Sequence, residues 1–441
     1  MLSLLRRRDF GLLWAGGLIS IAGDWILFAA LPYFVYEHTG STMATAGMTI
    51  ATLLPGVFLS SVGGAFADRA DRKRLLVAGN LLQAGAVSLL LLVPDGGWLG
   101  LVYVAAAAES ALASFTVPAE SALLPTLVEE SELVRANSLN ALNNRIGRLA
   151  GLPLGGLLLG SLGLRGVVVA DCATFVAAAL LIAPIRAPHP RHPETALEEA
   201  AAASAAFWQH WLDGLRLVRR ERAIALMFVV FGVMTFSGTM LDPPYPAWTR
   251  DVLHQGPQVF AALLTTSAAT GIVGALLIGR AGGRLEPRTL MGWGSLLAGV
   301  LSLAKYNLPT VPLAFALTAV GGMLAVGAAI GVETMVQRTV RDEYRGRVYG
   351  SLGASGSLLS LAGAATGGAV AQLVGIVPAL TLASVLIALA GLIVLRTSDG
   401  ATHEEQDHPA QRRHHGQDEQ PLDDGDGQND ACDHECCQQE K

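Results

Sequence analysis

Two acidic side chains lie in the middle of long apolar segments, where an ionisable group could do chemistry. Asp24 is midway along an apolar segment at 11–35, and Glu109 is midway along another at 98–118. A carboxyl group inside hydrocarbon is costly, so it persists only with a partner or a function. If its surroundings alternate, it can also bind and release a proton. We therefore predict that Asp24 and Glu109 bind a proton or a substrate. The alternative is a structural pair with Arg145 or Arg148, or a cap from a neighbouring hydroxyl.

Two arginines form a second candidate group. Arg145 and Arg148 are three residues apart, which places them on one face of a helix near one end of the apolar segment at 139–161. They could receive an anionic substrate. Pairing with a carboxylate at a gate is the favoured interpretation.

Other ionisable residues lie nearer the ends of apolar segments. They are Asp171, Asp242, Lys305 and Glu333. A charged side chain near the end of a membrane span can reach head groups or water. The favoured interpretation of each is therefore an interfacial anchor.

The elements that position these side chains are apolar helices. The chain is 52% hydrophobic and 15% charged, with 50 glycines among its 441 residues and a mean hydropathy of +0.46. Such a composition is typical of a polytopic membrane protein. A helix of about 20 residues crosses about 30 Å of hydrocarbon. Twelve segments are predicted to span, near 11–35, 44–63, 75–93, 98–118, 139–161, 166–185, 223–241, 258–279, 289–304, 311–332, 348–371 and 377–395.

The basic residues predict an orientation. If both termini are cytoplasmic, every Lys and Arg except Arg165, Arg250 and Lys305 falls on the inner side. Short cytoplasmic loops are enriched in basic residues. The sequence therefore predicts a multi-pass protein of the plasma membrane, the bacterial inner membrane, with both termini inside.

A charged turn joins the second and third spans. The sequence from Gly63 to Arg74 contains six charged residues. It resembles the signature of the major facilitator superfamily between helices 2 and 3. The matching residues are Gly64, Ala67, Asp68, Arg69, Arg72 and Lys73. The resemblance implies an all-α fold of twelve transmembrane helices in two pseudo-symmetric six-helix bundles, with Asp24 and Glu109 facing the central cavity.

The charged turn also suggests a conformational latch. Asp68 could be held against the start of the eleventh span, near Arg345 or Arg347. The positive end of that helix and the arginines would favour the carboxylate. We expect this contact to hold the bundles together while the site faces outward. The alternative is a solvated turn that only sets topology.

Small residues in the fifth span suggest a pivot between the bundles. Gly151, Pro153, Gly155 and Gly156 resemble a glycine- and proline-containing element of exporters and antiporters. Glycines allow close helix packing in membranes, and proline kinks a helix. Ordinary helix packing is the alternative.

The two halves of the chain repeat. The segment Gly282 to Arg288 lies between the eighth and ninth spans and looks like a degraded copy of the charged turn. This predicts an N-terminal six-helix bundle at 1–186 and a C-terminal one at 223–396. A connector at 187–222 contains an amphipathic helix, and a disordered acidic cytoplasmic tail covers 397–441.

Four further motifs resemble the branch of the superfamily that holds macrolide-efflux and enterobactin-export proteins. They are Gly23-Asp24-Trp25, Tyr36-Glu37-x-Thr39-Gly40-Ser41, Leu124-Pro125 with Arg135-Ala136-Asn137, and Arg345-Gly346-Arg347-Val348. The resemblance implies efflux of a moderately large, partly apolar molecule. We therefore predict a proton-coupled secondary exporter of a hydrophobic or amphipathic small molecule, such as a drug or a macrolide-like or siderophore-like compound. An importer of the same fold, a lysolipid flippase and a non-transporting receptor or scaffold are the alternatives.

No enzyme site is indicated. No lysine follows a glycine-rich turn, so a P-loop ATPase is excluded. The Cys and His residues of the tail match no metal-site spacing that supports a prediction. We expect a monomer in the lipid bilayer with a small-molecule substrate and no cofactor, metal or nucleic acid.

Overall fold

The computed structural model describes residues 2–93, 98–186, 222–282, 285–340 and 342–397, of which the side chains at 2, 222–224, 342–345 and 347 are not described. The predicted connector and the tail beyond residue 397 lie outside the described residues, apart from residue 222. All elements in the described part of the chain are helices. This confirms the all-α prediction.

The first half contains α1 to α6. Their bounds are α1 Leu2–Leu5, α2 Arg8–Thr39, α3 Thr42–Arg69, α4 Arg72–Ser88 with the 3-10 turn η1 Leu89–Leu92, α5 Leu99–Leu123, the 3-10 turns η2 Leu124–Leu127 and η3 Glu130–Glu132, and α6 Leu133–Ile182.

The second half contains α8 to α14. Their bounds are α8 Arg222–Met240, α9 Pro244–Ala247, the π-helical turn η4 Trp248–Val252, α10 Pro257–Ala281, α11 Pro287–Asn307, α12 Val311–Thr339, α13 Asp342–Leu373 and α14 Ile376–Arg396.

The described helices account for twelve spans. By length and apolar composition nine helices could cross a membrane, or ten if α8 and the α9–η4 segment, bent by 44°, form one span. Helix α6 is two helices joined at Gly163, which has a left-handed φ of 66°. Dividing it there and including the less apolar α11 gives the twelve that the sequence predicts.

Local capping ends and starts these helices. Gly40 terminates α2 with φ 62°, and Ser41 Oγ accepts a hydrogen bond from Ala44 N at 3.2 Å to start α3. Asp71 starts α4 in the same way, because its Oδ1 accepts from Arg74 N at 3.1 Å. Asp71 has φ −63°, so the charged turn needs no glycine at this position.

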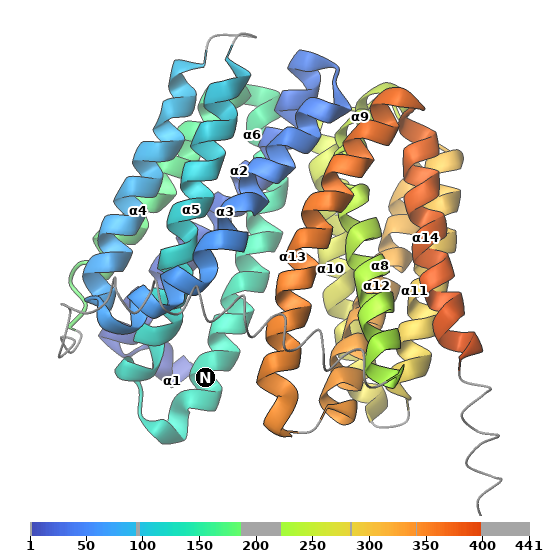
Figure 1. Cartoon of the computed structure of the whole chain (residues 1–441). Helices are drawn as coiled ribbons and strands as arrows, with labels where there is room; N and C mark the ends of the chain where they lie inside the picture. Colours follow the sequence, from blue (N-terminus) through green and yellow to red (C-terminus); the bar gives the residue numbers. More distant parts are fainter. Residues whose placement is uncertain (1, 94–97, 187–221, 283–284, 341, 398–441) are drawn as a thin grey trace, which may run out of the picture. The chain divides into compact units, whose positions relative to one another are not determined.

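Residues 1–396 form one compact unit with two groups of helices. In the first bundle, α1–α6, helix α2 packs along α6, and α5 packs on α3 and α4. In the second bundle, α8–α14, helix α11 packs on α12 and α14, and α8 packs on α13 and α14. Figure 1 shows the bundles side by side. The pairs α3–α13 and α6–α10 make the main contacts between them.

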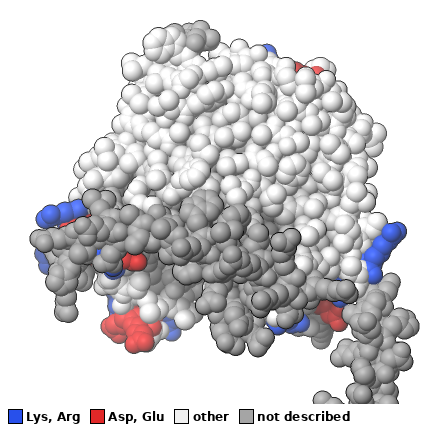
Figure 2. Space-filling view, viewed as in Figure 1, with Lys and Arg blue, Asp and Glu red and all other residues white. Residues whose placement is uncertain are grey.

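Charged side chains gather at the two ends of the helix bundles, which we call the basic end and the opposite end. The basic end is where α2 begins and α3 meets α4 at Arg69–Arg72, and the opposite end is where α2 meets α3 at Gly40–Ser41. Figure 2 shows a broad surface without charged side chains between these ends. Exposed apolar side chains of the described helices include Val104, Leu180 and Val229. A surface of this kind suits the hydrocarbon of a bilayer.

The hydrophobic core differs between the ends. At the opposite end one core cluster contains residues of both bundles, for example Leu31 and Phe34 with Trp248 and Phe260. At the basic end the first bundle has its own cluster, around Phe10. The second bundle has another, which includes Met227, Val336 and Val348. A smaller shared cluster, of Ala29 and Leu152 with Ala261, lies nearer the middle of the helices. Among the described residues, the core clusters at the basic end therefore belong to one bundle each, whereas those at the opposite end and nearer the middle are shared.

Candidate functional site

A cavity of about 290 Å³ lies between the two bundles, and we call it the interbundle cavity. Helices α2, α3 and α5 line it from the first bundle, and residues from α8 to α10 line it from the second. Three acidic residues line it, Asp24, Glu109 and Asp242, and no basic residue does. The structure therefore brings together the two carboxyl groups singled out in the sequence and adds a third.

The two carboxyl groups of the first bundle have different partners. Glu109 accepts a hydrogen bond from Gln83 Nε2 on α4 at 3.2 Å. Asp24 Oδ1 is buried and has no hydrogen-bond partner among the described residues. An unpaired buried oxygen is rare and calls for an explanation, such as a proton or a ligand that the protein binds.

Asp242 reaches the cavity because α8 is interrupted. Helix α8 ends at Met240, and Pro243 and Pro244 follow Asp242. Proline lacks the N–H that a continuing helix needs, so the chain bends before α9 and η4 continue the span. The sequence placed Asp242 at a span end, but the bend exposes its side chain inside the interbundle cavity.

Aromatic side chains form much of the remaining wall. Trp25 and Phe28 on α2 lie with their ring centroids 5.0 Å apart, and Tyr245 and Phe260 of the second bundle lie 5.4 Å apart. An apolar cavity with a few convergent polar groups is the usual form of a small-molecule site.

The two predicted arginines are placed differently from each other. Arg148 Cζ lies 4.6 Å from the ring centroid of Trp25, which lines the cavity, whereas Arg145 is exposed. No acidic partner lies within 4 Å of either arginine in the described part of the chain. The favoured pairing with a carboxylate is therefore not formed in this structure.

Two residues expected at the membrane interface are buried instead. Asp171 on α6 is fully buried, and its Oδ1 accepts from Thr174 Oγ1 at 3.3 Å. A Cβ atom on Gly23 would lie 2.3 Å from this oxygen, so only glycine fits at that place on α2. Lys305 is 8% exposed inside the second bundle. Lys305 is still inside α11, which extends to Asn307, and Asp171 packs against α2 at Gly23. Counting residues from a span end overlooks both facts.

The predicted pivot glycines pack in two directions. A Cβ on Gly151 or Gly155 would lie within 2.4 Å of a backbone oxygen of α2, inside the first bundle. A Cβ on Gly156 would lie 2.6 Å from Pro257 O on α10, in the second bundle. Pro153 is exposed. Adjacent glycines thus allow α6 to approach one helix of each bundle.

Hydrogen bonds also join the bundles at the opposite end. Tyr33 Oη donates to Gln255 O at 2.9 Å, and Tyr36 Oη donates to Asp251 Oδ2. Between α3 and α13, Thr42 Oγ1 donates to Gly368 O at 2.9 Å.

The predicted latch lies at the basic end. Asp68 is exposed, and no contact with the second bundle is recorded for it among the described residues. Arg72 Nη1 donates to Ala122 O at 3.0 Å, within the first bundle. The other first-bundle members of the predicted latch, Gly64, Arg69 and Lys73, are half-buried there. The side chains of Arg345 and Arg347 lie outside the described ones.

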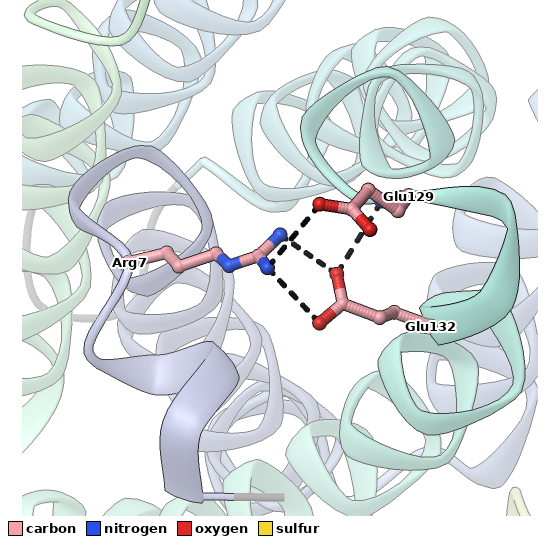
Figure 3. A network of polar contacts seen from close by, with 3 residues as sticks. All are labelled: Arg7, Glu129 and Glu132. Atoms are coloured by element: carbon pink, nitrogen blue, oxygen red, sulfur yellow. Dashed lines mark hydrogen bonds and ion pairs between the residues drawn. The ribbon is translucent and has the colours of Figure 1, made fainter.

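A further ion pair at the basic end also stays within the first bundle. Arg7 contacts Glu132 at 2.7 Å and Glu129 at 3.7 Å (Figure 3). These residues connect the start of α2 to the turn before α6. In the described part of the chain, no group of three or more His, Cys, Asp or Glu could hold a metal ion.

Comparisons with known proteins identify similar sequences. Residues 1–428 match the family described as transmembrane secretion effector, a group within the major facilitator superfamily. An uncharacterized MFS-type transporter, YfiS, of Bacillus subtilis (strain 168) is 25% identical over 86% of this chain and 90% of its own. Macrolide efflux protein A of Streptococcus pyogenes is 25% identical over 80% of this chain and 86% of its own length. Multidrug efflux pump Tap of Mycobacterium tuberculosis is 26% identical over 76% of this chain and 80% of its own length.

Solved structures share the fold. A bacterial homologue of the iron transporter ferroportin, in an inward-facing state, has a TM-score of 0.68 at 15% identity, over 88% of this chain and 98% of that one. A mutant of the nucleoside transporter NupG has a TM-score of 0.72 at 12% identity, over 88% and 99%. At such identities the likeness shows the fold alone.

Proposed function

Because this chain belongs to the transmembrane secretion effector family of the major facilitator superfamily, and is thus a multi-pass transporter of a bacterial membrane, we propose that it is a proton-coupled secondary exporter. It moves a hydrophobic or amphipathic small molecule out of the cell by alternating access. Two similar relatives bear the names of efflux proteins, which supports export over import.

The observation that carries this proposal is the charge of the interbundle cavity. Three acidic and no basic side chains stand among aromatic rings. Such a lining favours an apolar molecule with a positive charge, for example a protonated amine, because rings and carboxylates both attract cations. At about 290 Å³ the cavity is near the lower limit for drug-sized ligands, so a larger substrate requires the bundles to move apart.

Alternating access would use the difference between the two ends. The bundles share a core at the opposite end and have separate cores at the basic end. We interpret this arrangement as one of two states, in which the opposite end is closed. In the other state the predicted latch of Asp68 with Arg345 or Arg347 would close the basic end.

Proton coupling would depend on Asp24 and Glu109. A substrate cation and a proton can compete for the same carboxylates, so release of one accompanies binding of the other. A carboxylate at this depth costs about 2.5–3.5 kcal/mol on insertion scales, which is consistent with a functional role. Arg148, next to Trp25, would hold that ring in place, and Asp242 would add charge from the second bundle.

The test is uptake of a fluorescent aromatic cation, ethidium, into inverted membrane vesicles under an imposed pH gradient. We expect uphill uptake by the wild type and none by Asp24→Asn or Glu109→Gln, although exchange down a gradient can persist. Glu130→Gln, an exposed acid at the basic end, is the matched control and should transport normally.

Other outcomes would identify a different function. Normal uphill uptake by both variants would refute the coupling assignment. Transport of labelled lysolipid but not of ethidium would indicate a flippase. Accumulation of ethidium inside whole cells would indicate an importer. Binding of ethidium without any transport would indicate a receptor or scaffold.

The orientation is also a proposal, with the basic end and both termini in the cytoplasm and the protein acting as a monomer. In a background without native cysteines, a cysteine at Gln255 should react with an impermeant thiol reagent from outside. Cysteines at Ala70 and Glu286 should react only after permeabilisation. The reverse pattern would overturn the orientation and the direction of transport argued from it.

A further inference from the structure

A second cavity lies inside the second bundle and is separate from the interbundle cavity. It measures about 310 Å³ and is lined by residues of α8, α10, α11, α12 and α14, with none from the first bundle. Small residues on α12, including Gly321, Gly322 and Ala325, leave the space open. We call it the second-bundle cavity.

A buried lysine lines this cavity. Lys305 near the end of α11 is 8% exposed, and its Nζ lies 4.3 Å from the ring centroid of Tyr306 and 4.8 Å from that of Tyr245. No hydrogen bond or carboxylate partner is recorded for Nζ among the described residues. Tyr245 also lines the interbundle cavity, where the three acids lie.

Aromatic faces satisfy this ammonium only in part. A ring face attracts a cation, but an ammonium group has three N–H donors that need acceptors. A charge withdrawn from water is retained when it is paired and hydrogen-bonded. The residues that line the cavity include no Asp or Glu. In the described part of the chain, the lining of this cavity therefore offers Lys305 no negatively charged partner.

Hydroxyl groups stand around the same space. Ser295, Ser302 and Lys305 are seven and three residues apart on α11, so they share one face of that helix. Ser267 on α10 and Thr318 on α12 line the cavity from other helices. Ser295 Oγ already donates to Met291 O at 2.7 Å. The other hydroxyls, together with the ammonium group, suit the oxygen atoms of a carboxylate or a phosphate.

We propose that the second-bundle cavity is a binding site for a small organic anion, whose carboxylate or phosphate oxygen accepts a hydrogen bond from Lys305 Nζ. The hydroxyl of Ser302 contributes a further donor. This site is independent of the exported substrate and of the direction of transport, because none of its residues carries the proposed function above.

The test is calorimetric titration of the purified full-length protein in phosphatidylcholine nanodiscs with benzoate and with phenyl phosphate. Benzyl alcohol is the neutral comparison. We expect the anions to bind the wild type, and Lys305→Gln to weaken them about tenfold or more, as loss of a charged hydrogen bond would. Lys305→Arg should retain binding, and benzyl alcohol should not distinguish the variants.

Two further variants separate binding from folding. A Cβ on Gly321 would meet no atom within 4 Å, so Gly321→Leu can fill the cavity without a clash and should abolish anion binding while Lys305 is intact. Arg165→Gln removes an exposed arginine elsewhere and should leave binding unchanged.

The source of the anion is resolved by adding phosphatidylglycerol to the nanodiscs. Competition by this lipid for benzoate would identify a lipid head group as the occupant, and its absence would indicate a soluble anion. Equal anion binding by wild type, Lys305→Gln and Gly321→Leu would overturn the proposal. So would a wild type that does not prefer benzoate to benzyl alcohol.

Discussion

The two ends of this molecule differ in the contacts between the bundles. At the opposite end, α6 meets α10 at Gly156, α3 meets α13 at Gly368, and tyrosine hydroxyls donate across the interface. At the basic end, the recorded ion pair of Arg7 and the hydrogen bond of Arg72 stay within the first bundle. Each bundle also has its own core there.

Under the proposed alternating access, this difference separates contacts that would break from contacts that would persist. Internal contacts at the basic end maintain each bundle whether or not the bundles touch at that end. Contacts across the opposite end are short and mostly uncharged, so they hold one state without burying an unpaired charge. A transporter with two states needs the free energies of its two closed ends to be similar.

The largest expected effect is that of Gly156→Leu. Its Cβ would lie 2.4 Å from Ala261 Cβ and 2.6 Å from Pro257 O, so α6 and α10 must separate. Because two contacts clash at once, we expect overpacking of about 3 kcal/mol, which would shift the ratio of states roughly 150-fold and abolish export. Spin labels at the exposed Leu162 and Leu308 should move apart.

The matched control is Gly85→Leu on α4, where an added Cβ would meet no atom within 4 Å. It should leave both the spin-label distance and export unchanged. An unchanged distance in Gly156→Leu would mean that α6 and α10 can adjust locally, and that this contact is not a pivot.

Asp68→Asn should have the next largest effect. Asp68 is exposed in this structure, so the change should affect only the other state, in which the latch is proposed to form. Loss of a contact of about 1–3 kcal/mol shifts the ratio roughly 5- to 150-fold towards the present state and slows export, with little loss of protein. Export is measured at equal expression.

Arg74→Gln is the control for this substitution, because exposed Arg74 pairs with Asp71 inside the same turn. Normal export by both variants would contradict the latch and would mean that the charged turn only sets the topology of the chain in the membrane.

Tyr36→Phe should have the smallest effect. Unlike Asp68→Asn, it should shift the ratio of states away from the present state. It removes the hydrogen bond to Asp251 across the opposite end. Because Asp251 is exposed to water, such a bond contributes about 0.5–1.5 kcal/mol, so the present state should lose population by about 2- to 13-fold. Tyr103→Phe is the control, since Tyr103 Oη donates to Ala44 O within the first bundle. Equal distances between spin labels in both variants would contradict a role in closure.

Much of the fold follows from the sequence, because hydrocarbon requires every spanning helix to satisfy its own backbone. The apolar segments predict the helices that are observed, within a few residues of their ends. The charged turn and the match to the family lead to the same twelve-helix fold. The depth of Asp24 and Glu109 in their spans predicts a functional role, and both line the interbundle cavity.

The remaining parts of the site were missed for identifiable reasons. Counting from a span end treats Asp242 and Lys305 as interfacial, but the bend after α8 turns Asp242 into a cavity and the packing around α11 buries Lys305. The glycines of α6 look alike in the sequence, yet Gly155 faces α2 and Gly156 faces α10. Spacing along one helix does not specify which neighbour each face meets.

The sequence by itself determined the membrane environment, the helices and the accumulation of basic residues at one end, because these depend on apolar content and charge along the chain. Only the tertiary structure decided which side chains share a cavity and which end of the bundles is closed. Those properties arise from contacts between residues such as Tyr33 and Gln255, which are 222 positions apart. Local preference cannot encode such contacts, since they form only when separate helices pack.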